Sequence, residues 1–234
     1  MKKLSIIIPI YNEEKNLKKL LRRIDLIKLG KINKEIIAID DGSTDNSLDI
    51  LKKFKKIKIL RQKNQGKGKA VQLGISKSIG DYVIIQDGDL EYDPKDIITM
   101  CKKIHLQSKT CIYGSRYMPF TFGFIPKYSK GQHFSSYIAN IVFIFLFFIF
   151  YGRLISDPLT GYKLYKKEFF KKNTIQSKGF EADHEISAKL IKQKYNIIEV
   201  PISYKPRTIA EGKKINFFDG IKAIFTIIKY RFIN

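Results

Sequence analysis

Residues 82–94 read YVIIQDGDLEYDP, an apolar run followed by carboxylates at every second position. The run 82–86 has the length and the β-branched content of a buried strand. The acidic residues after it are Asp87, Asp89, Glu91 and Asp93. Like charges this close together repel one another unless a positive group lies among them. The stretch therefore predicts a strand whose carboxyl end carries a charged site.

A divalent cation is one group that would remove this repulsion. Asp87 and Asp89 are separated by a single residue, so both carboxylates can face the same side of a turn at the strand end. Mg²⁺ and Mn²⁺ prefer such oxygen ligands and often bridge to substrate phosphates. A solvated turn is the second interpretation of the pair, and the sequence leaves both open. Asp93 precedes a proline, which favours a helix N-cap over a metal ligand.

Alternating strand and helix signals extend through the first hundred residues and predict an α/β fold. A mainly parallel sheet with helices on both faces follows from this order. Ligands of such sheets bind beyond the carboxyl ends of the strands, where Asp40 and Asp41 also fall. The predicted strands are 4–10, 35–40, 57–60 and 82–86, and the predicted helices are 13–28, 45–55, 67–78 and 94–106.

The second half of the chain is less regular. Its unbroken apolar run, residues 141–151, is shorter than the roughly 20 residues that span a bilayer, so we expect a buried or interface-lying helix. We divide the chain into a domain of residues 1–206 and a basic amphipathic tail of residues 207–234. A helix near 181–194 and a strand at 197–204 precede the tail, whose apolar residues at helical spacing are Phe217, Phe218, Ile221, Ile224, Phe225 and Ile228.

Composition limits the function classes only loosely. The formal charge is +22, from 44 Lys and Arg against 22 Asp and Glu. This charge is compatible with nucleic acid, an anionic membrane or phosphorylated substrates, and equally with a plain lysine bias. Because no nucleic-acid recognition motif or single basic stripe occurs, we expect no nucleic-acid partner. Cys101 and Cys111 have no metal-ligand spacing, which indicates free thiols in a reducing compartment. The short apolar run at the N-terminus favours a strand over a signal peptide.

Residues 64–70, NQGKGKA, form a glycine-rich step between a predicted strand and a predicted helix. Glycines there let the backbone approach a phosphate, and Lys67 supplies positive charge. The chain contains neither a Walker loop nor a G-x-G-x-x-G fingerprint.

Taken in order, these segments resemble the family 2 glycosyltransferases with a GT-A fold. The matching segments are SIIIPIYNEEKNL (5–17), IIAIDDGSTDNS (36–47), NQGKGKAVQLGI (64–75) and GDYVIIQDGDLEYDP (80–94). A narrower likeness is to the dolichyl- or polyprenyl-phosphate mannosyl and glucosyl synthases. It rests on YGSRY (113–117), SDPLTGYKLY (156–165), GFEADHEI (179–186) and VPISYKPRTIAEGKKINFFDGIKAI (200–224).

The resemblance implies roles for the matched positions. The base and ribose of a nucleotide sugar, GDP-mannose or UDP-glucose, would be lined by Pro9, Tyr11, Glu13, Asp40 and Asp41, with Lys67 near the phosphates. Mg²⁺ or Mn²⁺ would be held by Asp87, Asp89 and Glu91, where the family often has Gln in place of Glu91. The acceptor phosphate would meet Arg116, Lys130, Arg207, Lys213 and Lys214.

The residues also indicate a mechanism. A phosphate monoester ionises a second time at about pH 6, so it arrives largely as a dianion and needs no strong base. Arginine and lysine must instead hold two anionic groups together. One direct displacement predicts inversion at the anomeric carbon. Asp157 resembles a catalytic acid of the family, although an Asp-Pro turn is an equal explanation. The alternative acceptor is a saccharide hydroxyl, as in surface-polysaccharide or cell-envelope assembly, with Asp157 or Glu185 as general base.

The segment EADHEI places Glu181, His184 and Glu185 on one helical face. It begins like the zinc-protease motif H-E-x-x-H, but Ala188 stands at the second histidine, so the zinc-protease interpretation fails. Glu181 either contacts the acceptor or is solvated.

Membrane contact follows from a polyprenyl acceptor, whose chain stays in the bilayer. Residues 138–151 and the basic tail are the candidates to lie in the interface. We expect a monotopic, peripheral protein on the cytoplasmic face of a membrane.

Overall fold

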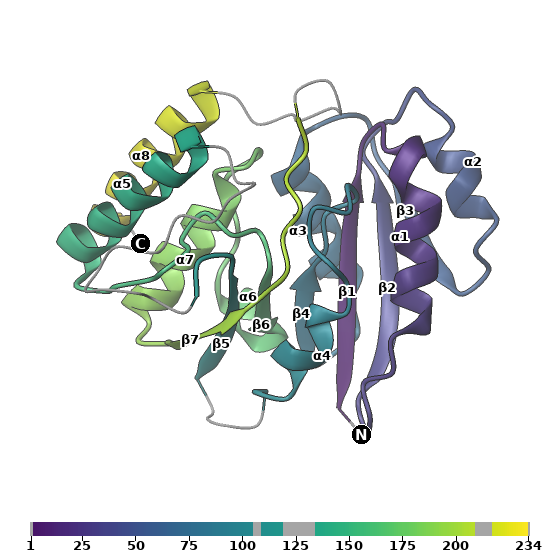
Figure 1. The fold of residues 1–234 in the computed structure, drawn as a ribbon, viewed down its shortest axis with the longest axis horizontal. Coiled ribbons are helices and arrows are strands. Elements are labelled where there is room, and N and C mark those ends of the chain that lie inside the picture. Colours follow the sequence, from purple (N-terminus) through teal and green to yellow (C-terminus); the bar gives the residue numbers. More distant parts are fainter. Residues whose placement is uncertain (1, 105–108, 119–133, 209–216, 234) are drawn as a thin grey trace.

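The computed structural model describes residues 2–104, 109–118, 134–208 and 217–233. The described residues form one seven-stranded sheet in the order β3-β2-β1-β4-β6-β5-β7 (Figure 1). Only β6 runs antiparallel to its neighbours among these strands. The strands are β1 (Lys3–Ile10), β2 (Asn33–Asp40), β3 (Ile57–Arg61), β4 (Tyr82–Ile85), β5 (Thr110–Ser115), β6 (Lys163–Lys166) and β7 (Asn196–Pro201).

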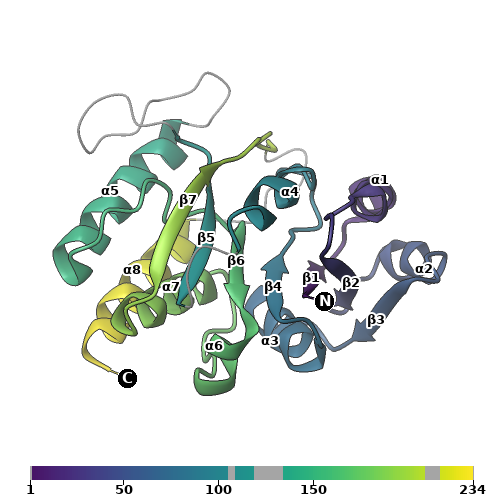
Figure 2. The ribbon, with the colours of Figure 1, turned by 90° about the horizontal axis from the view of Figure 1, so that it is seen from below.

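Helices cover both faces of the sheet (Figure 2). One face carries α1 and α4, and the other carries α3, α6, α7 and α8. The helices are α1 (Glu14–Leu26), α2 (Ser47–Lys52), α3 (Lys67–Lys77), α4 (Asp96–Cys101), α5 (Phe134–Tyr151), α6 (Lys167–Lys172), α7 (Ala182–Lys192) and α8 (Phe217–Phe232).

Strand β1 shows why the apolar runs form the centre of the sheet. Successive side chains of a strand point to opposite faces. Ile6 and Ile8 therefore enter the core beneath α1 and α4, while Ile7 enters the core beneath α3 and α7. All three side chains are fully buried. A strand covered on both faces needs a continuous apolar run, which is the pattern the sequence shows.

The predicted α/β fold and the four predicted N-terminal strands are confirmed. The helix expected at 94–106 is shorter, because α4 ends at Cys101. Asp93 accepts a hydrogen bond from the Lys95 amide at 3.0 Å, so it supports the turn before the helix and not the helix itself. The strand expected at 197–204 ends at Pro201, and Tyr204 forms an isolated bridge with Tyr92.

Candidate active site at the carboxyl edge of the sheet

Four carboxylates from the ends of β1 and β4 lie close together, and we call Glu13, Asp87, Asp89 and Glu91 the acidic cluster. Beyond β4 the chain turns sharply at Leu90, whose φ of 62° lies in the left-handed region. The Asp89 carboxylate accepts a hydrogen bond from the Glu91 amide at 3.0 Å within this turn. The turn therefore leaves the Asp89 and Glu91 carboxylates facing the same group, the guanidinium of Arg207.

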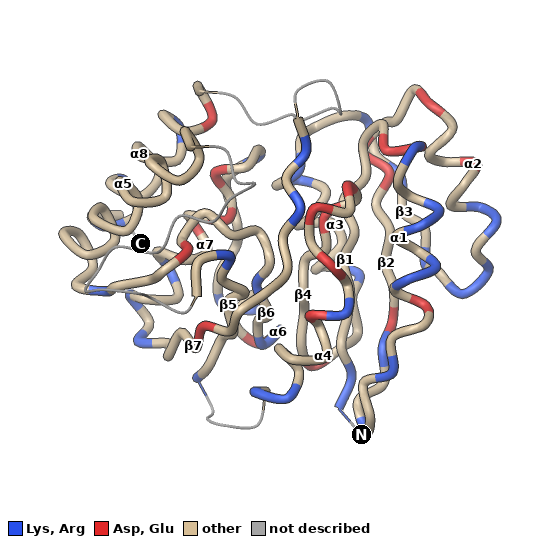
Figure 3. Tube along the Cα trace, viewed as in Figure 1, with Lys and Arg blue, Asp and Glu red and all other residues tan. Residues whose placement is uncertain are grey.

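The chain itself supplies positive groups to the acidic cluster. Lys67 Nζ, in the first turn of α3, lies 2.7 Å from Asp87 Oδ1 and 3.6 Å from Asp183 Oδ2. Arg207 Nη2 lies 2.8 Å from Asp89 Oδ2, and Arg207 Nη1 lies 3.0 Å from Glu13 Oε2. Figure 3 shows basic segments beside the acidic loops at this edge. In this structure, lysine and arginine offset the repulsion that the sequence poses.

Burial at the cluster shifts the ionisation of its members. Burial, with the charges of Asp87 and Glu91, raises the pKa of Asp89 to about 7, and Arg207 opposes this rise. Burial lowers the pKa of Lys67, but the charges of Asp87 and Asp183 outweigh it and raise the pKa overall. The pKa of Arg207 is also raised, since Asp89, Glu13 and Glu91 outweigh its burial. Both bases therefore stay protonated beside the carboxylates.

The chemistry of the cluster fits a divalent cation. Glu13, Asp89 and Glu91 already converge on one cationic group, the guanidinium of Arg207. Their oxygens are the ligands that Mg²⁺ and Mn²⁺ prefer. Within the described residues, however, no three His, Cys, Asp or Glu side chains are arranged to hold a metal ion as they stand. A metal at this position would take carboxylates that now face Arg207.

A second charged pair joins Arg116, directly after β5, to Asp157 in the loop before β6. Arg116 Nε and Nη2 each lie 2.7 Å from a different oxygen of Asp157, and the Arg116 amide adds a hydrogen bond of 3.0 Å. The side chain of Asp157 is 0% exposed and that of Arg116 is 8% exposed. Asp157 therefore uses both oxygens on Arg116, and the pair is a buried, two-pronged ion pair.

Aromatic rings and a second buried acid hold this pair. The Arg116 guanidinium carbon lies 4.8 Å from the ring centre of Tyr204 and 5.4 Å from that of Tyr117. Glu199 accepts hydrogen bonds from the Ser156 amide at 2.9 Å and from the Asp157 amide at 3.3 Å. Burial raises the pKa of Glu199. Tyr204 also donates to Glu91 at 2.8 Å, so it joins the ion pair to the acidic cluster.

The expected donor-binding residues lie together at the ends of β1 and β2. Pro9 and Tyr11 close β1, and the Tyr11 side chain remains 37% exposed. Asp40 is buried, and its Oδ2 lies 3.2 Å from Arg61 Nε. Asp41 accepts hydrogen bonds from the amides of Gln65 and Gly66, each at 2.9 Å. Asp41 therefore fixes the start of the glycine-rich step.

The glycines of that step are needed for packing. A Cβ on Gly66 would lie 2.8 Å from the Lys178 carbonyl oxygen, and a Cβ on Gly68 would lie 2.6 Å from the Ser177 carbonyl oxygen. Both neighbours are backbone atoms, so neither can move aside cheaply. The φ of Gly66 is also +94°, a conformation that other residues rarely adopt.

Helix α7 adds to the charged site one residue that the sequence did not point to, Asp183. Asp183 reaches Lys67, whereas its neighbours on the predicted face point elsewhere. His184 packs against Phe143, and burial lowers its pKa to about 3. Glu185 accepts hydrogen bonds from the backbone of residues 176 and 177, and Glu181 accepts them from the amides of residues 178 and 179. No local pattern points to Asp183, because its partner Lys67 lies far away in the chain.

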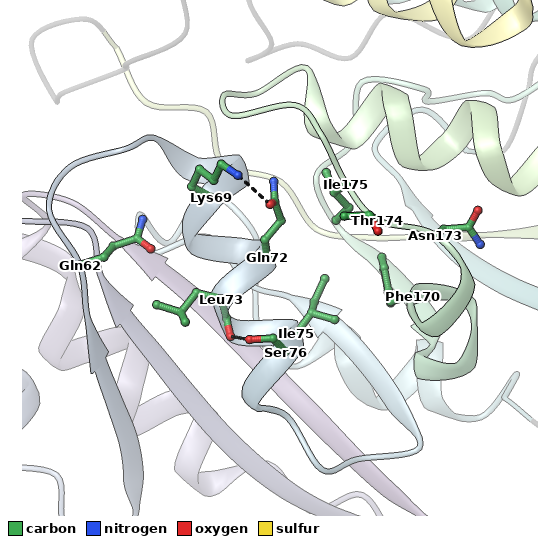
Figure 4. A pocket seen from close by; sticks show the side chains of 10 residues that line it. All are labelled: Gln62, Lys69, Gln72, Leu73, Ile75, Ser76, Phe170, Asn173, Thr174 and Ile175. Carbon is green, nitrogen blue, oxygen red and sulfur yellow. Dashed lines mark hydrogen bonds between the residues drawn. The ribbon is translucent and has the colours of Figure 1, made fainter. Parts of the chain in front are cut away.

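Two pockets lie between α3, the segment after α6 and α8. One of about 450 Å³ lies between α3 and the segment after α6, and Figure 4 shows Gln62, Lys69, Gln72 and Asn173 around it. Another, of about 630 Å³, lies between Gly66, residues 176–181 and α8. Neither of these two is lined by Asp87, Asp89 or Glu91. Gln62 connects the first pocket to the site, because its amide donates to Asp41 at 2.6 Å.

Three of the predicted acceptor residues, Lys130, Lys213 and Lys214, lie outside the described residues. The other two predicted acceptor residues are described: Arg116 lies next to Tyr204, and Arg207 lies next to Glu91. The structure thus brings the donor, metal and acceptor candidates that it describes to one edge of the sheet.

This sheet, with helices on both faces and charged groups at its carboxyl edge, has the GT-A fold. The chain is similar in structure to glucosyl-3-phosphoglycerate synthase from Mycobacterium tuberculosis in complex with uridine diphosphate, with a TM-score of 0.75 and 15% identity, over 100% of this chain and 81% of that one. Residues 5–174 match the family model "Glycosyl transferase family 2". The chain belongs to this family and is an enzyme.

Two relatives match nearly all of the chain. It is 30% identical to a dolichol-phosphate mannosyltransferase from Pyrococcus furiosus, over 97% of this chain and 64% of that protein. It is 28% identical to a UDP-N-acetylglucosamine–dolichyl-phosphate N-acetylglucosaminyltransferase from Methanococcus voltae, over 95% of this chain and 94% of that protein. The chain thus spans less than two thirds of the Pyrococcus relative.

Proposed function

We propose that this chain transfers a hexose from a nucleoside diphosphate sugar to a polyprenyl phosphate, with inversion and with Mg²⁺ or Mn²⁺. The observation that carries the proposal is the buried pair of Arg116 and Asp157. A hydroxyl acceptor needs a base, but Asp157 uses both of its oxygens on Arg116. A phosphate acceptor needs a held guanidinium instead, which this pair provides.

The proposed reaction is one displacement. An oxygen of the acceptor phosphate attacks the anomeric carbon, and the bond from that carbon to the nucleoside diphosphate breaks. Arg116 and Arg207 would bring the anionic acceptor close to the anionic donor. Asp87, Asp89 and Glu91 would hold the divalent cation, whose charge stabilises the departing diphosphate. Pro9, Tyr11, Glu13, Asp40 and Asp41 would line the base and ribose.

The relatives support this assignment of the acceptor. Both are named for transfer to a dolichol or dolichyl phosphate, one as a mannosyltransferase and the other as an N-acetylglucosaminyltransferase. The sequence matches them along nearly its whole length, including the segment around Arg207 that follows the family match. The two names differ in the sugar, so the donor must be found by experiment.

The surface of α5 and α8 supports a membrane-bound acceptor. Within the described residues α5 is long and apolar enough to cross a membrane, with a mean hydropathy of 2.0, and 22% of it is buried. Helix α5 has 18 residues, more than the unbroken apolar run 141–151 that the sequence analysis compared with the length of a membrane span. Asn140 donates to the Ser156 carbonyl at 2.9 Å, and Tyr151 donates to the Ile227 carbonyl at 2.8 Å. These bonds fasten α5 along the domain, which favours a helix lying in the interface over one that spans the bilayer.

Helix α8 extends the same apolar surface. It packs beside α5 (Figure 1), and Phe217, Phe218 and Phe225 are each at least 68% exposed. Lys222, Lys229 and Arg231 would meet anionic headgroups. We therefore propose that residues 207–234 are a membrane-facing tail on the domain of residues 1–206, at the cytoplasmic face.

A transfer assay tests the proposal. The purified chain is offered polyprenyl phosphate, Mg²⁺ or Mn²⁺, and labelled GDP-mannose, UDP-glucose or UDP-N-acetylglucosamine. We expect label from one donor in the organic phase, abolished by EDTA and by Asp89→Ala. Asp93→Asn is the matched control, because Asp93 belongs to the same acidic stretch but pairs with Arg23 on the surface. A parallel reaction contains an oligosaccharide in place of polyprenyl phosphate, and label transferred there but not to the lipid would refute the phosphate acceptor.

A further inference from the structure

Arg207 occupies the position at which three carboxylates of the acidic cluster meet. Its guanidinium lies 2.8 Å from Asp89, 3.0 Å from Glu13 and 3.5 Å from Glu91, measured between the nearest charged atoms. The side chains of all four residues are at most 15% exposed. Ion pairs that are shielded from water in this way are screened little by salt. Arg207 is therefore a firmly held counter-ion at the position where the metal is proposed to bind.

Glu91 also anchors the backbone around Arg207. The Arg207 amide donates to Glu91 Oε1 at 3.0 Å, and the Tyr204 hydroxyl donates to Glu91 Oε2 at 2.8 Å. The Lys205 amide donates to the Glu91 carbonyl at 2.8 Å. We call residues 204–207 the latch. Both carboxylate oxygens of Glu91 are engaged by the latch, so a metal on Glu91 would draw on the same oxygens that hold it.

A guanidinium and a divalent cation repel each other strongly at the distances of one ligand set. We propose that Arg207 competes with the divalent cation for the acidic cluster, and that metal binding releases the latch. This inference rests on the metal dependence in the proposed function. Arg207 would then be free to face phosphate groups only after the metal has taken its carboxylates.

The latch also reaches the second arginine of the site. The Tyr204 ring covers the Arg116 guanidinium at 4.8 Å, while its hydroxyl bonds Glu91. Release of the latch therefore uncovers one face of Arg116. A single event at the acidic cluster would make both arginines available to phosphate. A glutamine at position 91 would keep the hydrogen bond to Tyr204 but lose the charge that faces Arg207.

Binding of Mn²⁺ to the full chain, without nucleotide or lipid, tests the competition. Free Mn²⁺ is measured by electron paramagnetic resonance. Arg207→Gln is expected to bind Mn²⁺ more tightly by on the order of tenfold, because a unit positive charge leaves the ligand set. Tyr204→Phe is expected to bind more tightly by about twofold, since it loses one hydrogen bond of the latch and no charge. Arg23→Gln, which removes a charge paired with the exposed Asp93 at 3.6 Å, is expected to bind as the wild type does.

Hydrogen exchange on the wild-type chain gives a second readout that needs no variant. Added Mn²⁺ is expected to speed the exchange of the Lys205 and Arg207 amides, both of which Glu91 holds. Unchanged or weaker Mn²⁺ binding by Arg207→Gln, or unchanged or slower exchange of these amides with Mn²⁺, would overturn the proposal. Neither experiment contains a sugar nucleotide or a lipid. If the transfer reaction fails, Mn²⁺ binding and amide exchange can still be measured. If the competition between Arg207 and the metal is wrong, only these two measurements change.

Discussion

Replacing Asp157 by Asn distinguishes two roles for this carboxylate, the ion-pair partner of Arg116 and a general base. The side chain is 0% exposed and forms a two-pronged ion pair with Arg116, which is itself 8% exposed. The change leaves a buried guanidinium without its negative partner. Breaking a buried pair from one side costs about 3–5 kcal/mol of the free energy of unfolding. Because the amide oxygen of Asn can still accept one hydrogen bond, we expect the lower end, about 3 kcal/mol, or a melting temperature lower by roughly 6–12 °C for a domain of this size.

Thermal unfolding followed by circular dichroism measures this loss. Asp49→Asn is the matched control, since Asp49 pairs with Lys52 on the surface and no change in melting temperature is expected. The double variant Asp157→Asn with Arg116→Gln should regain part of the loss, because no buried charge is then left alone. A variant Asp157→Asn that is as stable as the wild type but inactive would refute this reasoning, and would restore Asp157 as a general base.

Three further predictions concern stability and membrane binding. Burial lowers the pKa of His184 to about 3, so below about pH 6.5 the unfolded chain binds a proton that the native chain does not bind. The free energy of unfolding therefore falls by up to about 1.4 kcal/mol per pH unit, down to about pH 3. Urea titrations at several pH values should show a smaller acid loss for His184→Phe than for the wild type. Phe225→Ser should weaken sedimentation with anionic liposomes about tenfold, whereas Leu26→Ser, at an equally exposed residue on α1, should not; equal effects would remove α8 from the membrane face. Gly68→Ala should destabilise the chain by about 1–3 kcal/mol, while Gly220→Ala, with open space around its Cβ in α8, should stabilise it by about 0.5–1 kcal/mol; a loss in both would contradict the packing argument.

The local pattern was sufficient for the N-terminal half of the fold and insufficient for the rest. Strands β1, β2 and β4 are runs rich in Ile and Val bounded by polar residues, and such runs can be recognised as strands from the sequence alone. Strand β6 has only four residues and begins with Lys163, a fully buried lysine. Burial lowers the pKa of this lysine. A charged residue at the start of a short segment predicts a loop, so a strand whose neighbours are contributed by distant segments was not foreseen.

The candidate site shows the same division between local and distant information. The carboxylates after β4 were predicted because their spacing is visible in thirteen consecutive residues. Their partners were not, since Lys67 and Arg207 approach from positions about 20 and 116 residues away. The sequence suggested a metal as the positive group among the carboxylates, and the fold adds two protein cations, Lys67 and Arg207. Whether the metal displaces Arg207 is a question that only the folded arrangement could raise.

In helix α8 the apolar residues at helical spacing fall on two faces, one exposed and one packed on the protein. The expected apolar residues at helical spacing included Phe217, Phe218 and Phe225, which are the exposed ones. The face that packs on α5 and α7 carries Ala223 and Ile227. A helix that is apolar on both sides is favoured where each side meets an apolar surface, and the protein core covers one side of α8. Large exposed aromatic surfaces are unfavourable in water, so this face of α8 supports the proposal that the helix lies in a membrane interface, where basic residues beside aromatic ones are stable.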